Sequence, residues 1–155
     1  MHTLPEAQKI NELARSVFAR DGYHMPLVIL FKRDKNYLLP IGPMMRNQGS
    51  KEALVGVIKK TIQDFGISGV VLITEAWMAL VEQSDGETLG EIRSGKRVSD
   101  LETKKEVLMV RAESDDGLNV TFMNQIERDA DGKPSLKDPE IMTSQMGGRF
   151  GGFFE

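Results

Sequence analysis

The chain has 155 residues, of which 28% are charged, and its formal net charge is −3. This length predicts one domain, and this charge gives no overall attraction to nucleic acid or anionic lipid. The absence of cysteine excludes disulfides and thiolate chemistry and favours a reducing compartment, so we expect a cytoplasmic protein. We expect no membrane contact, because the first residues lack a signal-peptide layout and no apolar run reaches the roughly 18 residues that span a bilayer.

The N-terminal part of the chain predicts a helix followed by a hairpin. Residues 4–20 form the predicted helix, and Thr3 begins a capping box in front of it. Its apolar stripe consists of Ala7, Ile10, Leu13, Ala14, Val17 and Phe18. Residues 27–32 and 37–41 form the predicted hairpin, in which Pro40 places the second strand at a sheet edge because proline cannot donate a ladder hydrogen bond.

The middle of the chain predicts a second helix and a long strand. Ser50 is the expected N-cap of a helix over residues 51–65, which ends at Gly66. The apolar stripe of this helix consists of Leu54, Val55, Val57, Ile58, Ile62 and Phe65. The β-rich run over residues 69–81 is either a strand buried on both faces or an edge strand used for pairing. Residues 82–104 form a charged connection, and connections of this length are more often functional or partly disordered than merely connecting.

The final hairpin spans residues 106–129, and its register follows from the apolar pattern. A three-residue loop over residues 115–117, with Gly117 left-handed in a bulge, puts the apolar side chains of both strands on one face. The expected pairs are Leu108 with Asn124, Val110 with Phe122, and Ala112 with Val120. The opposite face then becomes a mixed polar surface of Met109, Arg111, Glu113, Asn119, Thr121, Met123 and Gln125.

The order of elements is helix, two strands, helix and three strands, which predicts an α+β fold. We expect a single antiparallel sheet of about five strands with both helices packed on its apolar face. Residues 1–141 form the expected domain, and residues 142–155 form a tail rich in glycine and phenylalanine. This order of elements resembles that of profilin-like and Roadblock-type domains, a likeness that implies no function.

Three short segments carry a second resemblance. They are Thr74-Glu75-Ala76-Trp77 on a strand, Arg97-Val98-Ser99-Asp100 in the charged connection, and Lys104-Lys105-Glu106-Val107-Leu108 after it. With these segments the chain resembles small bacterial and phage proteins of unknown function over residues 25–130. The resemblance implies no activity.

Metal ions and cofactors are not expected from the sequence. His2 and His24 are the only histidines, and neither has a second ligand at a useful spacing. Residues 129–132 begin like a calcium loop, but the later ligands are missing, so we interpret them as a turn. The sequence contains no phosphate-binding loop or dinucleotide motif, and no serine has the context of a catalytic triad.

Glu75 interrupts an apolar strand and is the first candidate site residue. On a strand it shares a face with Trp77, so either this face is exposed or the carboxylate is paired, with Arg111 as the expected partner. One interpretation is a structural ion pair, or a solvent-facing carboxylate beside a half-exposed tryptophan. The other is a shallow site in which these three residues bind a small ligand or a side chain of a partner.

Two further stretches carry candidate residues. Arg93 and Arg97 belong to a basic cluster in the charged connection, but no aromatic residue interleaves it, so we do not expect nucleic-acid binding. The tail contains Phe150, Phe153 and Phe154. It either folds back onto its own domain or is disordered, or else it docks in a groove of another chain with these phenylalanines as anchors.

Two functional hypotheses follow. The favoured one is a non-catalytic interaction module that self-associates or docks a protein partner through Trp77, Met109 and Met123, with the tail contributing. The alternative is a small enzyme or ligand-binding protein that acts on an anionic molecule by carboxylate acid–base chemistry. Its site would combine Glu75 and Arg111 with the loop residues Arg93, Arg97, Ser99 and Asp100.

Overall fold

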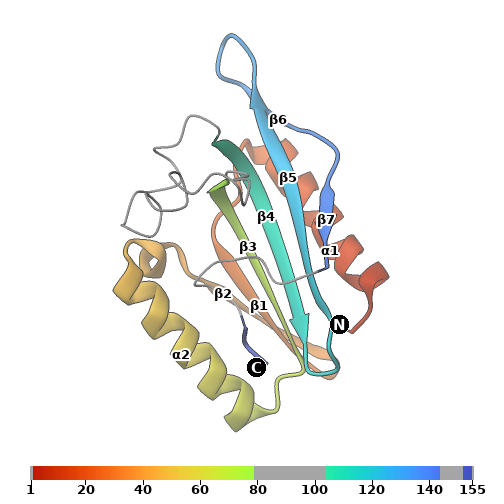
Figure 1. Ribbon diagram of the computed structural model, residues 1–155, viewed down its shortest axis with the longest axis vertical. Helices are drawn as coiled ribbons and strands as arrows, with labels where there is room; N and C mark the ends of the chain where they lie inside the picture. The colour runs from red at the N-terminus through yellow and green to blue at the C-terminus, as the bar shows by residue number, and fades with distance from the viewer. Residues whose placement is uncertain (1, 79–103, 144–151, 155) are drawn as a thin grey trace, which may run out of the picture.

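The computed structural model describes residues 2–78, 104–143 and 152–154. In this part of the chain, two long helices accompany one curled antiparallel sheet (Figure 1). The expected α+β fold with a single antiparallel sheet and two helices is therefore confirmed. Neither helix in the described residues is long and apolar enough to cross a membrane.

The first helix, α1, spans Leu4–Asp21, close to the predicted range. The Thr3 hydroxyl accepts a hydrogen bond from the Glu6 backbone N–H at 3.3 Å, so the predicted N-cap is present. Gly22 ends the helix with a left-handed φ of 78°, and its N–H donates to the Phe18 carbonyl.

The second helix, α2, spans Gln48–Phe65 and begins earlier than predicted. Its N-cap is Asn47, whose side-chain oxygen accepts the Ser50 N–H at 2.9 Å. The expectation of Ser50 as N-cap was wrong because the helix begins one turn earlier, so that Ser50 is the third residue of its first turn and Asn47 is the cap. The helix follows a short 3-10 helix over Gly42–Met45 and ends, as expected, at Gly66.

The sheet has the strand order β2-β1-β3-β4-β5-β6, with β7 also paired to β5. The strands β1 (Leu27–Lys32) and β2 (Lys35–Pro40) form the expected hairpin, and β2 is the edge strand that Pro40 predicted. The long strand β3 is described as Gly69–Met78 and lies between β1 and β4. Burial on both faces, one of the two alternatives for this run, holds for residues 69–74, whereas residues 75–78 are exposed or half-buried.

The strands β4 (Lys105–Ser114) and β5 (Asn119–Arg128) pair in the predicted register. Leu108 lies opposite Asn124, Val110 opposite Phe122, and Ala112 opposite Val120. Gly117 has a φ of 101°, as the three-residue loop requires. Two short strands were not predicted, β6 (Pro134–Leu136) and β7 (Glu140–Met142), which pair with successive parts of β5.

The two helices lie on opposite faces of the sheet, which differs from the expectation that both cover one face. On one face, α1 buries Phe18 with Val71 and Val110. On the other, α2 buries Ile58 with Leu72. Consecutive residues of β3 therefore enter different cores, because side chains alternate along a strand and this strand is apolar on both sides.

The expected mixed polar surface is also largely buried. Arg111 and Glu113 are 6% and 4% exposed, and Thr121 and Met123 are 1% and 5% exposed. The face lies on the α2 side of the sheet, where α2 and Phe153 pack against Leu72. Sequence alternation identified which residues share this face, but it gave no information on what covers it.

Candidate functional site

The structure does not bring Glu75 and Arg111 together. In the pairing of β3 with β4, Glu75 lies opposite Leu108 and Arg111 lies opposite Leu72. Leu108 belongs to the α1-side core and Leu72 to the α2-side core, so the two charged side chains point to opposite faces. The expected ion pair between them was wrong.

Arg111 instead pairs with Glu113 two residues further along β4, with Nε 3.2 Å from Oε2. The same carboxylate accepts the backbone N–H groups of Gly152 and Phe153 at 3.2 and 3.1 Å. Phe153 is buried in the core on the α2 side, and Phe154 packs against that core. Of the alternatives for the tail, folding back onto the domain describes these residues.

Glu75 lies on the α1 side near Glu106, Arg128 and His24. Partial burial raises the pKa of Glu75, and the negative charge of Glu106 raises it further. Arg128 and His24 lower the pKa of Glu75, and the Arg128 guanidinium binds both oxygens of Glu106, at 3.0 and 2.6 Å. Glu75 is thus a partly solvated carboxylate beside an ion pair that is complete without it.

Trp77 lies on the same face as Glu75, as predicted, and is 47% exposed. The Lys104 ammonium is 5.0 Å from the centre of its ring, within the range of a cation–π interaction. Met109 and Met123 lie on the opposite face, where Met123 lines a small hollow of about 70 Å³. The three residues proposed as one docking surface are therefore divided between the two faces.

Five other candidates lie outside the described residues. They are Arg93, Arg97, Ser99 and Asp100 of the charged connection, and Phe150 of the tail. Their proposed roles stay predictions.

A further apolar feature is a part of the α1 side that α1 does not cover. The helix packs over β4, β5 and β6, and in the described part of the chain no helix covers the same face of β1 and β2. We call this region the open apolar face. It consists of Leu27, Ile29 and Phe31 of β1, Leu38 of β2, and Ile10, Leu13 and Val17 of α1.

The position of Arg15 shows which flank of α1 borders the open apolar face. Arg15 reaches Asn124 of β5 and the Lys137 carbonyl, so its flank points toward the β6 edge. Helical spacing puts Ile10, Leu13 and Val17 on the other flank, which points toward β1. The apolar stripe predicted for α1 was thus wider than the helix needs to cover β4, β5 and β6. This extra width was the feature of the sequence that indicated the open apolar face.

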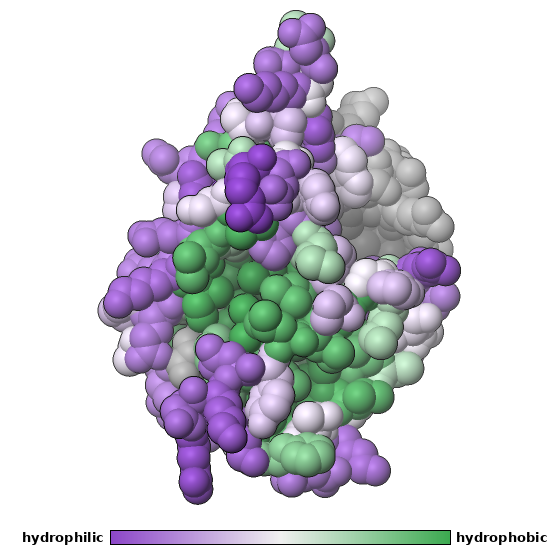
Figure 2. All heavy atoms as spheres, turned by 180° about the vertical axis from the view of Figure 1, so that it is seen from behind, coloured by the Kyte–Doolittle hydropathy of each residue, from purple (hydrophilic) through white to green (hydrophobic). Residues whose placement is uncertain are grey.

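Figure 2 shows the α1 side, with a broad apolar area in its centre and polar side chains around it. Leu13 and Leu38 are the most exposed members of the open apolar face, at 67% and 64%. Leu38 shares this face because it lies opposite Ile29 in the β1–β2 pairing. Contiguous exposed apolar areas of this kind mark contact surfaces more often than isolated exposed leucines do.

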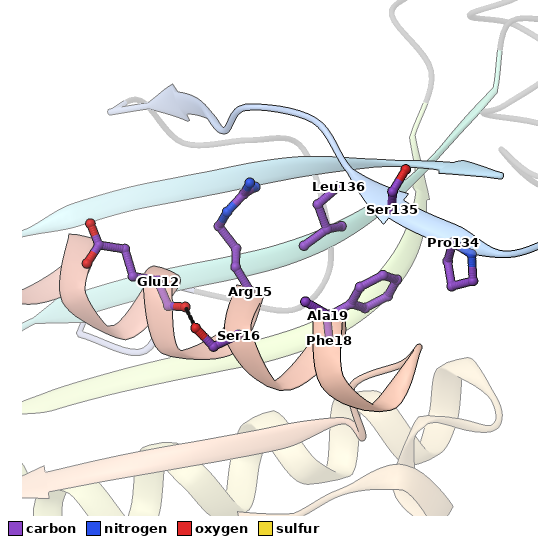
Figure 3. A pocket seen from close by; sticks show the side chains of 8 residues that line it. All are labelled: Glu12, Arg15, Ser16, Phe18, Ala19, Pro134, Ser135 and Leu136. Carbon is purple, nitrogen blue, oxygen red and sulfur yellow. Dashed lines mark hydrogen bonds between the residues drawn. The ribbon is translucent and has the colours of Figure 1, made fainter. Parts of the chain in front are cut away.

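A cleft of about 520 Å³ lies on the other flank of α1, between the helix and β6. Arg15, Ser16, Phe18 and Leu136 are among its lining residues (Figure 3). Arg15 donates to Asn124 and Lys137, and the Ser16 hydroxyl donates to the Glu12 carbonyl. These polar groups are engaged within the chain, and the Glu12 carboxylate and the Ser135 hydroxyl are the other polar side-chain groups of the lining.

The fold also brings His2 to the β4–β5 loop, a proximity that sequence spacing did not indicate. Its Nδ1 lies 3.5 Å from an oxygen of Asp115 and 3.4 Å from one of Asp116. All three residues are exposed. Exposed groups of this kind are common without a metal ion, and the cluster is described most simply as a surface contact between polar side chains.

The fold and the open apolar face define a small α+β domain in which the described residues cover one sheet face incompletely. The chain belongs to the family described as bacteriophage lambda protein ea47, whose model matches residues 2–152. This match confirms the resemblance to phage proteins. No curated protein and no solved structure matches the chain, and the likeness to profilin-like and Roadblock-type domains is not confirmed.

Proposed function

We propose that this protein is a non-catalytic interaction module that pairs with a second copy of itself through the open apolar face. The observation that carries the proposal is the apolar surface of β1 and β2 beside the apolar flank of α1, half-buried at β1 and exposed at Leu13 and Leu38 among the described residues. Covering this surface removes apolar area from water, which is the main favourable term in most protein association. The absence of cysteine favours a reducing compartment, so we place this function in the cytoplasm.

A second copy fits this surface for a geometric reason. The helix α1 stands about 10 Å above its sheet, and two sheets packed face to face are also about 10 Å apart. Two open faces related by a two-fold axis can therefore pack together, with α1 of each copy beside the β2 edge of the other. This arrangement brings Leu13 of one copy to Leu38 of its partner and leaves the polar outer face of α1 in water.

The alternative of an enzyme acting through Glu75 and Arg111 has less support. The two side chains lie on opposite faces of the sheet. Glu75 lines neither the cleft beside β6 nor the hollow at Met123. An interaction module needs no such convergence of charged groups.

Light scattering over a range of concentrations tests the proposal with the full chain. We expect a dimer for the wild type and a monomer for Leu13→Glu and for Leu38→Glu, because each change buries a charge in the contact. Val57→Glu is the matched control, since Val57 is 59% exposed but lies on α2. A monomeric wild type, or a dimer that both variants leave intact, would contradict the proposal.

A further inference from the structure

A second site lies on the α2 side of the sheet, where residues 152–154 contact Glu113. We propose that this site binds a peptide segment carrying two adjacent free backbone N–H groups and an aromatic side chain. Residues 152–154 occupy the site in this structure, and such a segment can displace them; we call these residues the resident. We call the site the Glu113 seat; it consists of Glu113, Arg111, Leu72 and Ile58. It lies on the opposite face from the proposed dimer contact and is independent of it.

The carboxylate of Glu113 gives the seat its preference for peptide backbone. Its Oε2 accepts from Arg111 Nε and from the Gly152 N–H, both at 3.2 Å, and its Oε1 accepts from the Phe153 N–H at 3.1 Å. A buried carboxylate is costly unless its oxygens accept hydrogen bonds. Without a bound segment, Glu113 would keep the Arg111 guanidinium and lose both backbone N–H donors. The site therefore favours any segment that supplies two N–H donors.

The apolar part of the seat gives a preference for an aromatic side chain. Phe153 is 4% exposed and belongs to the same core cluster as Ile58 of α2 and Leu72 of β3. Its ring therefore lies between the helix and the sheet. A smaller side chain at this position would leave part of that space unfilled.

The seat is formed by elements that do not include the segment it holds. Glu113 and Arg111 belong to β4, Leu72 to β3 and Ile58 to α2. Residues 152–154 are not part of a strand, and the hydrogen bonds to Glu113 come from their backbone. An identical segment supplied from outside can make the same contacts, which is the basis for expecting exchange.

Gly152 offers a way to weaken the resident without changing the seat. Its φ is 68°, in the left-handed region that favours glycine. Gly152→Ala retains the N–H group and the Phe153 ring but strains the backbone. A non-glycine residue in this region should shift the equilibrium between the bound and the released tail by about tenfold toward release.

The experiment uses full chains and a fluorescent peptide of the sequence Arg149–Glu155. We expect the peptide to bind Gly152→Ala and Phe153→Ala chains about tenfold or more tightly than the wild type, measured by anisotropy, because the weakened resident competes less. The same peptide with alanine in place of Phe153 should bind none of them. If Phe153→Ala fails to fold, as circular dichroism would show, Gly152→Ala decides the outcome.

Two results would overturn the proposal. One is equal binding of the peptide to the wild type and to the folded variants; the other is no binding to a folded variant. The Leu38→Glu chain should bind the peptide as the wild type does, whatever its mass in solution. This control separates a failure of the Glu113 seat from a failure of the proposed dimer.

Discussion

The two faces of the sheet are covered in different ways. On the α2 side, the helix and Phe153 enclose Leu72 and a buried ion pair, Arg111 with Glu113. On the α1 side, one helix covers β4–β6, and in the described part of the chain the apolar residues of β1 are half-buried and Leu38 of β2 is exposed. A helix about 10 Å wide covers roughly two to three strands spaced 4.8 Å apart, so one helix leaves part of a six-stranded face uncovered. On the α2 side Phe153 adds to the cover, whereas on the α1 side Leu13 and Leu38 are exposed in the described part of the chain.

The position of α1 is fixed by polar contacts as well as by apolar packing. Asn124 Nδ2 donates to Asn11 Oδ1 at 2.8 Å and to the Leu108 carbonyl at 3.0 Å. The Asn124 side-chain oxygen accepts from Arg15 at 2.8 Å. Hydrogen bonds have directional requirements that apolar contacts lack, so this network holds the helix over β4 and β5 and away from β1.

The largest effect on stability is expected on the α2 side, from Glu113→Ala. The change leaves the Arg111 guanidinium buried without its carboxylate and removes both acceptors of the tail residues. Breaking a buried pair in this way costs about 3–5 kcal/mol in the free energy of unfolding, measured with urea. Glu127→Ala is the matched control, because its partner Lys137 is 51% exposed and such pairs contribute about 0–1 kcal/mol. An equal loss in the free energy of unfolding for the two variants would contradict the burial of the Arg111–Glu113 pair on the α2 side.

A smaller effect is expected for Asn124→Ala, which removes the polar anchor of α1. The Asn11 amide and an Arg15 donor lose their partner, and an unsatisfied buried group costs about 1–3 kcal/mol in the free energy of unfolding. Asn119→Ala on the same strand is the control, because in the described part of the chain its side-chain oxygen has no hydrogen-bond partner. Hydrogen exchange should show α1 amides losing protection in Asn124→Ala but not in Asn119→Ala. If both variants lose the same stability, the network does not anchor α1.

The smallest effect on stability is expected on the α1 side, from Glu75→Gln. Partial burial raises the pKa of Glu75 above its ordinary value of 4.5, so the folded chain holds this proton more tightly than the unfolded chain. Its contribution is favourable below pH 4.5 and is lost as pH rises through the folded pKa. Above that pH, Glu75→Gln should unfold at a slightly higher urea concentration than the wild type.

Glu106→Gln should change the stability at neutral pH in the opposite direction. The Arg128 hydrogen bond lowers the pKa of Glu106, so its stabilising contribution is present at neutral pH and is lost as pH falls through the folded pKa. Removing Glu106 should therefore destabilise the chain at neutral pH. If Glu75→Gln destabilises the chain at neutral pH as well, burial does not dominate the environment of Glu75.

Local features of the fold could be predicted from the sequence because short-range chemistry fixes them. Thr3 marks the start of α1, and Pro40 identifies the edge strand. The register of β4 and β5 followed from Gly117 and from the need to keep Val110 and Phe122 on one face. Each of these conclusions depends on residues close together in the chain or directly opposite each other across one turn.

The placement of the layers could not be predicted in the same way. Val71 and Leu72 are both apolar, so the pattern of β3 allows a helix on either face. Arg111 and Glu113 appear solvent-facing in the sequence because nothing local indicates that Phe153, some 40 residues later, packs over them. The open apolar face was missed because Leu13 and Leu38 are ordinary core-type residues in pattern, and their exposure depends on where α1 is anchored.

The central claim is that the open apolar face is a contact between two copies of this chain, with Leu13 of one beside Leu38 of the other. Sedimentation equilibrium on Leu13→Lys, Leu38→Glu and the chain carrying both changes tests it most directly. We expect each single variant to be monomeric and the double variant to recover dimer, because the two introduced charges then attract across the contact. A double variant that is as monomeric as the single ones, while the wild type is a dimer, would contradict this arrangement of the two copies.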